Sequence, residues 1–250
     1  MKGYLLYAQG DTHINYAIQC AYSLREIGDT KPISLVTDKP CNDTVFDKII
    51  IVKENTDKFH VVNRSNLWKH SPYDETTVIE SDCLVTQSLD TWWQANADRD
   101  LSFISQAYTY RQEPLDIRFD RRTWIQNDLP SLYVAFHYFK KTSFVKEFFE
   151  LVTTINSHEE ITKTFLPKRS PKVPSMDVAI CLATKFLDCY YKVAYTASDP
   201  MFIHMKPNAQ KFATPSTNWS DKVGFYKNGS EVFIGNFKQT GILHYIEEVV

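Results

Sequence analysis

Residues 76–85 read TTVIESDCLV, and this stretch decides how the chain is organised. Thr76 to Glu80 has the β-branched, apolar character of a buried strand, and Asp82 follows just after that strand ends. Because side chains alternate along an extended chain, two acids one residue apart point the same way. Two carboxylates that converge at the carboxyl end of a strand repel each other, so the pattern favours a divalent cation or another positive partner.

A simpler interpretation explains the same residues. The strand can leave the core into a polar turn in which Asp82 caps the backbone, and a bare acid-x-acid pattern favours this interpretation. The residues alone therefore leave open whether the acids bind a ligand or only end a strand.

The segments before this stretch alternate between strand and helix patterns. From Ile14 to Ile27 apolar residues recur at helical spacing, and Gly28 ends the pattern. Short apolar runs around this helix predict strands over residues 4–8, 33–37 and 47–52. This order predicts an α/β fold with a mostly parallel central sheet covered by helices on both faces.

The second half of the sequence is less regular, although it carries the same two kinds of element. Residues 132–139 predict a strand, and the segments 143–155 and 176–187 predict helices. Residues 163–174 hold three prolines and four basic side chains and predict a loop. No repeat or linker divides the sequence, so we expect one domain over residues 1–250. Short strands are expected near residues 193–195, 202–204, 232–234 and 242–245.

Composition excludes several classes of protein. The 250 residues are 43% hydrophobic and carry a net charge of −2, so the chain can bury a core and has no overall basic coat for nucleic acid. No apolar run reaches the roughly 20 residues that span a bilayer. Five cysteines without a Cys-x-x-Cys pair predict free thiols and a cytoplasmic location. The lack of a glycine-rich phosphate loop excludes P-loop and kinase-like proteins.

Four segments carry a family pattern in a fixed order. They are Asn15–Asp38 with a helix and a strand, Ser71–Trp93 with the acid-x-acid pair, Pro174–Ala183 at a helix start, and Phe202–Pro207 with a His-x-Lys element. Together they resemble the glycosyltransferases of the GT-A fold, in particular glycogenin-like sugar transferases. In that family the acid pair is an Asp-x-Asp motif, whereas the first acid here is Glu80.

The resemblance implies a fold, a reaction and a set of site residues. It implies a Rossmann-like GT-A domain in which residues 1–100 bind a nucleotide sugar and residues 101–250 form a smaller, irregular acceptor side with the C-terminal strands. It implies a hexosyl- or pentosyltransferase that uses Mn²⁺ or Mg²⁺ and a nucleotide-diphosphate sugar, with a UDP-sugar as the first choice. In this comparison the metal ligands are Glu80, Asp82 and His204, Lys206 contacts the phosphates, and Asp177 is the catalytic residue that orients sugar or acceptor hydroxyls.

The nucleoside of the donor is expected over the first strand-to-helix turn. Arg64 and Lys69 precede the acid-bearing strand and could reach the diphosphate, although surface solvation explains them equally well. His204 and His244 each lie in an apolar strand, where a histidine is more often a core residue. The neighbouring Lys206 favours His204 as the ligand, with His244 as the next residue to test. The expected donor-binding residues are Ala8, Gln9, Gly10, Asp11, Asp38, Arg64, Lys69, Ser81 and Lys206.

The sequence leaves more than one acceptor and more than one reaction class open. Basic side chains between Arg111 and Lys172 are interleaved with aromatic ones, a mixture suited to phosphate contacts and base stacking. Compact transferases similar to this one are also encoded by bacteriophages. We therefore rank a hydroxymethylated pyrimidine in DNA as the first candidate acceptor, ahead of a glycan, lipid or protein. A nucleotidyltransferase has a related fold, but its glycine-rich basic loop after the first strand is missing. A non-enzymatic module that binds nucleotide or glycan is the remaining alternative.

Overall fold

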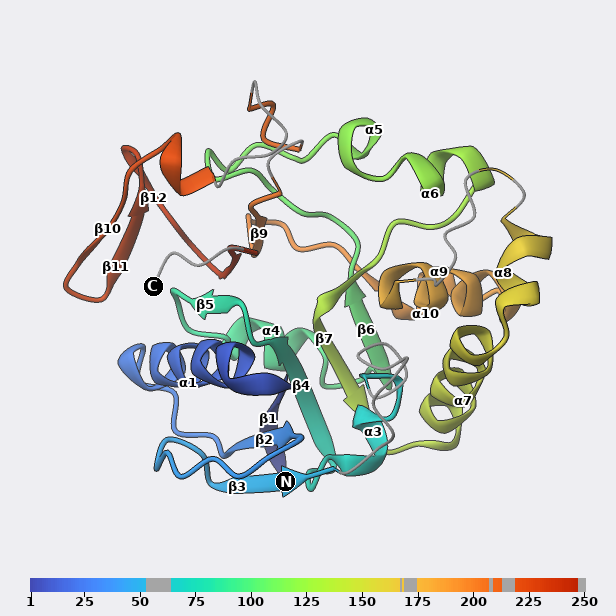
Figure 1. The fold of residues 1–250 in the computed structure, drawn as a ribbon, viewed down its shortest axis with the longest axis horizontal. Coiled ribbons are helices and arrows are strands. Elements are labelled where there is room, and N and C mark those ends of the chain that lie inside the picture. The colour runs from blue at the N-terminus through green and yellow to red at the C-terminus, as the bar shows by residue number, and fades with distance from the viewer. Residues whose placement is uncertain (53–63, 167, 169–174, 207–208, 213–218, 247–250) are drawn as a thin grey trace.

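A central sheet of seven strands organises the molecule, with helices on both sides (Figure 1). The computed structural model describes residues 1–52, 64–166, 168, 175–206, 209–212 and 219–246. Across the sheet the strand order is β3-β2-β1-β4-β7-β6-β8. The bounds are β1 Lys2–Ala8, β2 Ile33–Thr37, β3 Lys48–Ile51, β4 Glu75–Glu80, β6 Leu101–Ile104, β7 Tyr133–Lys140 and β8 Ala194–Tyr195.

The sheet is mostly parallel, which confirms the predicted α/β fold. β7 runs antiparallel to both of its neighbours, and every other pairing in this sheet is parallel. Tyr7 of β1 pairs with Glu80 of β4, and Ala8 pairs with Thr37 of β2. The carboxyl ends of these three strands therefore meet at one edge, where sheets of this class bind ligands.

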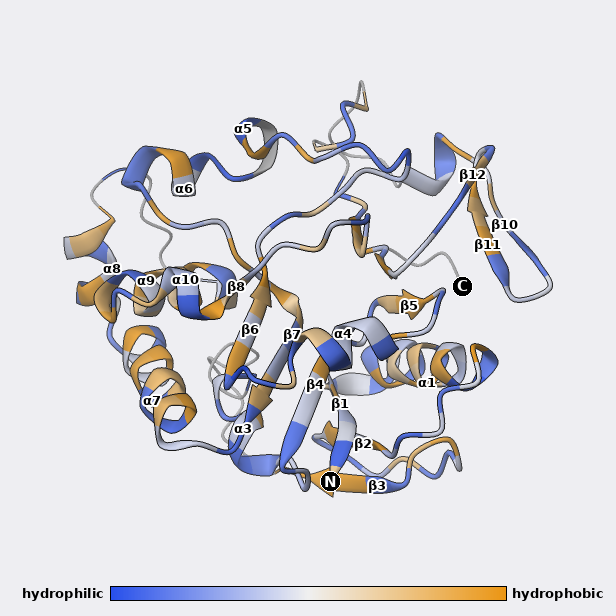
Figure 2. Ribbon diagram, turned by 180° about the vertical axis from the view of Figure 1, so that it is seen from behind, coloured by the Kyte–Doolittle hydropathy of each residue, from blue (hydrophilic) through white to orange (hydrophobic). Residues whose placement is uncertain are grey.

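Helices cover the two faces because the strands alternate their side chains. Tyr4 and Leu6 of β1 join the core under α1 (Gly10–Glu26) and α4 (Asp90–Ala95), whereas Leu5 joins the core under α7 and α9. Figure 1 shows α1 on one side of the sheet and α7 on the other, and Figure 2 shows that α7 and β6 are largely hydrophobic. Each fully buried large apolar side chain contributes about 1.5–3 kcal/mol. The two helices of the second face are α7 Ser143–Ser157 and α9 Met176–Phe186.

A small three-stranded sheet closes over the acid-bearing end of β4. β5 (Cys83–Val85) pairs with β13 (Ile242–His244), which in turn pairs with β9 (Phe202–His204). Gly241 precedes β13 with φ +77°, and a Cβ at this position would collide with the backbone carbonyl of Met201. Glycine therefore allows β13 to approach the chain that leads into β9.

The remaining elements lie around this frame. A second small sheet consists of β10 Phe225–Asn228, β11 Glu231–Ile234 and β12 Phe237–Lys238. None of the helices in the described part of the chain has the length and apolar character that a bilayer crossing requires. The other helices are α3 Leu67–His70, α5 Ile117–Asp120, α6 Arg122–Asn127, α8 Glu159–Phe165, α10 Tyr190–Val193 and the short 3-10 helix η1 Trp219–Asp221.

The loop predicted over residues 163–174 is only partly a loop. Residues 163–165 form the end of α8, because Thr162 and Leu166 are buried and hold this turn against the core. Residues 167 and 169–174 lie outside the described residues. The helix predicted from residue 176 is confirmed, and the Ser175 side chain caps it by accepting a hydrogen bond from the backbone N–H of Val178.

Candidate functional site

The two acids of the β4 end converge on one imidazole. Glu80 is the last residue of β4, and Asp82 lies in the turn that leads into β5. The Nε2 atom of His244 lies 3.3 Å from Oε2 of Glu80 and 3.2 Å from Oδ2 of Asp82. All three side chains are largely buried, with exposed fractions of 19%, 23% and 10% for Glu80, Asp82 and His244. The acid pair is thus part of a three-residue cluster.

Asp82 is held in its charged form. Burial opposes ionisation, but the charge and hydrogen bond of His244, together with the charge of Arg64, outweigh it and lower the pKa of Asp82 to about 2. Asp82 therefore carries a full negative charge throughout the neutral range, as a ligand for a hard cation must.

The cluster can hold a metal ion. Ligand atoms of Asp82, Cys83 and His244 lie within 4.8 Å of one another. Burial raises the pKa of Cys83 far above its usual range, so its thiol is protonated in the metal-free protein, and sulfur is a soft donor that does not suit Mg²⁺ or Mn²⁺. The carboxylate of Glu80, which faces the same imidazole nitrogen, is the better oxygen donor.

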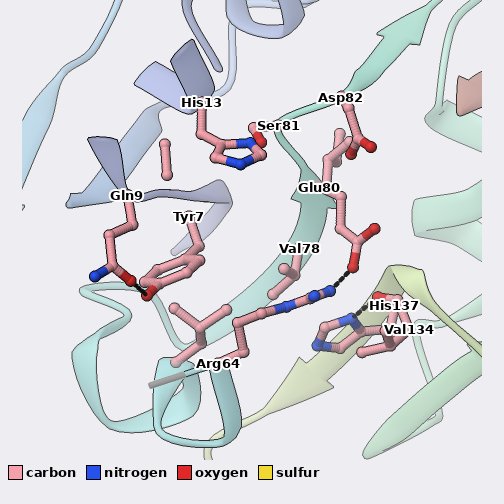
Figure 3. A pocket seen from close by; sticks show the side chains of 13 residues that line it. Tyr7, Gln9, His13, Arg64, Val78, Glu80, Ser81, Asp82, Val134 and His137 are labelled. Atoms are coloured by element: carbon pink, nitrogen blue, oxygen red, sulfur yellow. Dashed lines mark hydrogen bonds and ion pairs between the residues drawn. The ribbon is translucent and has the colours of Figure 1, made fainter. Parts of the chain in front are cut away.

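A cation already neutralises part of this negative charge. The guanidinium of Arg64 forms an ion pair with Oε1 of Glu80 (Figure 3). Burial lowers the pKa of Arg64, and the nearby carboxylates of Asp177 and Asp82 act in the opposite direction. Since a guanidinium keeps its proton at ordinary pH, Arg64 brings a permanent positive charge to the acids.

Glu80, Asp82 and Arg64 border a cavity of about 250 Å³ at the carboxyl edge of the sheet. Figure 3 shows the Arg64 side chain reaching the Glu80 carboxylate, with Tyr7, Gln9 and His13 on the other side of the view. The volume of the cavity is close to the lower end of the range for small-molecule sites. The lining residues are Tyr7, Ala8, Gln9, His13, Arg64, Leu67, Val78, Ile79, Glu80, Ser81, Asp82, Val134 and His137.

Some residues of the first strand-to-helix turn line the cavity, and the others stabilise the turn itself. Ala8 and Gln9 line the cavity, and the Tyr7 hydroxyl donates to Oε1 of Gln9 at 3.0 Å. The backbone N–H of Gly10 donates to Oδ1 of Asp38 at 3.0 Å, so this carboxylate stabilises the N-terminus of α1. The exposed Asp11 forms an ion pair with Lys39 at 2.6 Å. Gly10, Asp11 and Asp38 thus support the turn and are not among the lining residues.

Three basic or imidazole side chains of the expected set are not among the residues that line this cavity. Nδ1 of His204 lies 3.0 Å from Nδ1 of His244, so His204 stands behind His244. Lys206 follows β9 with an exposed side chain. Lys69 lies over the ring of Trp68 and borders a separate cavity of about 320 Å³.

Asp177 lies in the first turn of α9 and faces β7. Its Oδ1 accepts a hydrogen bond from the backbone N–H of Val134 at 2.8 Å and lies 3.7 Å from Nη2 of Arg121. The side chain is 30% exposed. Asp177 therefore fixes the strand that carries two lining residues, and part of its carboxylate remains accessible.

Sequence reasoning did not place His13, His137 and Tyr7 in the site, and it ranked His244 second. Burial lowers the pKa of His137 to about 4, so this lining imidazole is neutral and its Nδ1 bonds the Val134 carbonyl at 2.7 Å. His204 and His244 end equally short apolar strands, so only the β5–β13 pairing reveals which one reaches the acids. Tyr7 shares the face of Glu80 by strand register, a signal that was available once β1 and β4 were known to be neighbours.

By sequence, the chain matches neither any established family profile nor any curated protein. By structure, it is similar to the galactosyltransferase LgtC solved in complex with donor and acceptor sugar analogs, with a TM-score of 0.58, 12% identity, and coverage of 99% of this chain and 88% of that one. It is also similar to the glycosyltransferase GlyE of Streptococcus pneumoniae TIGR4, with a TM-score of 0.56 and 13% identity. The match covers 99% of this chain but 55% of GlyE, so the chain spans about half of that protein. The chain therefore has the GT-A fold of these glycosyltransferases.

Proposed function

We infer that the chain is a metal-dependent glycosyltransferase, which moves a sugar from a nucleotide-diphosphate sugar to a hydroxyl group. The observation that carries the proposal is the convergence of Glu80, Asp82 and His244 at the sheet edge where this class of fold binds ligands, with both acids lining a cavity. The fold shared with LgtC and GlyE supports the same reaction class.

The distances from the imidazole of His244 to the two carboxylates fit a small divalent cation. An ion with ligand distances of about 2.1 Å separates neighbouring octahedral ligands by about 3 Å. The distances of 3.2 Å and 3.3 Å from His244 Nε2 to the two carboxylates are close to that value. Carboxylate and imidazole donors suit Mn²⁺ as well as Mg²⁺. A bound cation would neutralise the charge that develops on the departing diphosphate.

The chain's own residues supply the remaining parts of such a site. Arg64 lies beside the acids and offers a fixed fork of donors to phosphate oxygens. The exposed Lys206, two residues beyond His204, is proposed as a second phosphate contact. Ala8 and Gln9 are proposed to border the nucleoside, for which a uridine nucleotide is the first to test. Asp177, which is partly accessible beside β7, is proposed to orient sugar or acceptor hydroxyls.

A sugar is a better supported acceptor than DNA. LgtC was solved with an acceptor sugar analog. Of the residues that favoured DNA, Arg121 is buried against the ring of Tyr133 and Tyr110 is also buried. Arg118 forms an ion pair with Asp116 at 2.6 Å. Arg121 and Tyr110 are engaged within the protein, which weakens the argument for a DNA-binding surface, whereas the Arg118 side chain is 78% exposed.

The test measures release of the nucleotide diphosphate from a panel of nucleotide sugars, with and without Mn²⁺, and with sugar or hydroxymethylated duplex DNA as the acceptor. Asp82→Asn is expected to lower metal-dependent turnover at least 100-fold, because it removes a charged ligand. Asp98→Asn, at an exposed acid away from the cavity, is the matched control. Transfer of the nucleoside monophosphate to the acceptor with release of a sugar 1-phosphate, instead of release of a nucleoside diphosphate, would identify a nucleotidyltransferase. Binding without any turnover would leave a binding module.

A further inference from the structure

Two histidines lie side by side near the acids, and only one of them reaches the carboxylates. His204 and His244 are register partners of the parallel strands β9 and β13. Their Nδ1 atoms lie 3.0 Å apart, and each residue is 8% exposed. A contact of this length between two ring nitrogens is a hydrogen bond that holds one proton, with one ring as donor and the other as acceptor.

The role of Nε2 of His244 determines which of the two Nδ1 atoms carries the shared proton. A neutral imidazole carries one N–H and one lone pair. When Nε2 of His244 offers its lone pair to a cation beside Asp82 and Glu80, the proton of that ring must be on Nδ1. Nδ1 of His204 must then accept it, so His204 carries its own proton on Nε2.

We propose that His204 is a positioning residue of the metal site, which holds His244 in its ligating tautomer and orientation by accepting its Nδ1–H. The proposal rests on the metal site of the proposed function, and it assigns His204 a role that differs from direct ligation. Ligating histidines almost always donate their second N–H to a fixed acceptor, and in this chain the acceptor is a second imidazole.

His204 is held firmly enough to act as that acceptor. Its backbone N–H donates to the carbonyl of Tyr108 at 3.0 Å, and its own carbonyl accepts from the side chain of Gln210 at 2.7 Å. Its ring packs against Tyr133 at 5.5 Å and Phe202 at 5.9 Å between centroids. The ring is therefore packed between aromatic neighbours and backbone contacts while Nδ1 points at His244.

Direct ligation by His204 is a poorer explanation. His244 stands between His204 and the acids, with its Nε2 on the carboxylates and its Nδ1 on His204. One ring thus bridges the other to the site.

The test compares Mn²⁺ affinity in the nucleotide-free protein, read from the electron paramagnetic resonance signal of free Mn²⁺. His204→Phe fills the same space without an acceptor, and it is expected to raise the dissociation constant about 10–100-fold. His204→Asn places an acceptor oxygen where Nδ1 stood, and it is expected to stay within about threefold of the wild type. His158→Phe, at an exposed histidine, controls for the loss of an imidazole that binds Mn²⁺ nonspecifically.

A second measurement needs no variant. Nitrogen-15 spectra of the histidine rings in the Mg²⁺-loaded wild type are expected to show His244 protonated on Nδ1 and His204 on Nε2. Unchanged Mn²⁺ affinity in His204→Phe, or a metal-loaded His244 protonated on Nε2, would overturn the role of His204 alone. Absence of Mn²⁺ binding in the wild type, or full binding in Asp82→Asn, would overturn the metal site of the proposed function as well.

Discussion

Replacing Asp82 with asparagine tests the electrostatics of the site without requiring a substrate. In the folded protein burial opposes the charge of Asp82, but His244 and Arg64 lower its pKa to about 2 from the usual 3.8. At about 1.4 kcal/mol for each pH unit, the charged form gains roughly 2 kcal/mol on folding. Because the pKa is lowered, this stability is fully present above pH 3.8 and is lost as the pH falls through 2.

Asparagine imitates the uncharged acid, so Asp82→Asn is expected to lose about 2 kcal/mol of unfolding free energy at pH 7. For a chain of this size that loss lowers the midpoint of thermal unfolding by roughly 4–8 °C. Tryptophan fluorescence and circular dichroism during urea and thermal unfolding, with a chelator present, measure the loss. The same scans with Asp98→Asn, an exposed acid, provide the baseline.

The pH series separates this cause from a packing defect. The difference between wild type and Asp82→Asn is expected to be constant from pH 7 to about pH 5 and to shrink below pH 4. Equal stability of Asp82→Asn and Asp98→Asn at pH 7 would refute the reasoning, since it would mean that His244 and Arg64 do not favour the charge. A difference that persists unchanged at pH 3 would indicate lost packing.

Two further predictions concern the scaffold. Gly241→Ala is expected to cost about 3 kcal/mol of unfolding free energy in urea, because φ is +77° and the new methyl group meets the Met201 carbonyl. Gly229→Ala, at φ +62° in open space, is the control and is expected to cost about 1 kcal/mol. Equal losses would show that the chain leading into β9 moves aside without a cost in stability. Burial lowers the pKa of His137 to about 4, so the wild type is expected to lose roughly 3 kcal/mol as the pH falls from 6.5 to 4. His137→Phe should give a flatter profile over that interval, and parallel profiles would contradict the pKa.

The sequence was sufficient to predict the position of the elements that form continuous apolar runs. The strands predicted over residues 33–37 and 202–204 have the bounds of β2 and β9, because each run is closed by polar residues. β5 was not predicted, since three apolar residues form a strand only when a partner supplies hydrogen bonds. That partner is β13, which no local pattern connects to the acids.

The candidate site was predictable to the extent that it is local. Glu80 and Asp82 stand out because their strand ends between apolar neighbours, and Ala8, Gln9, Arg64 and Ser81 line the same cavity. The histidine could not be chosen, because His204 and His244 occupy equivalent positions in similar strands. Which histidine contacts the acids depends on which strand lies beside β5, and this is a property of the tertiary structure and not of either segment.

The pairing of β5 with β13 also sets when the site can exist. The hydrogen bond between Asp82 and His244 joins residues 162 positions apart. A ribosome that adds about 5–20 residues per second needs roughly 8–30 s to make the intervening chain. During that time the nascent protein carries both carboxylates without their imidazole, so the cluster of Glu80, Asp82 and His244 forms only once His244 has emerged from the ribosome.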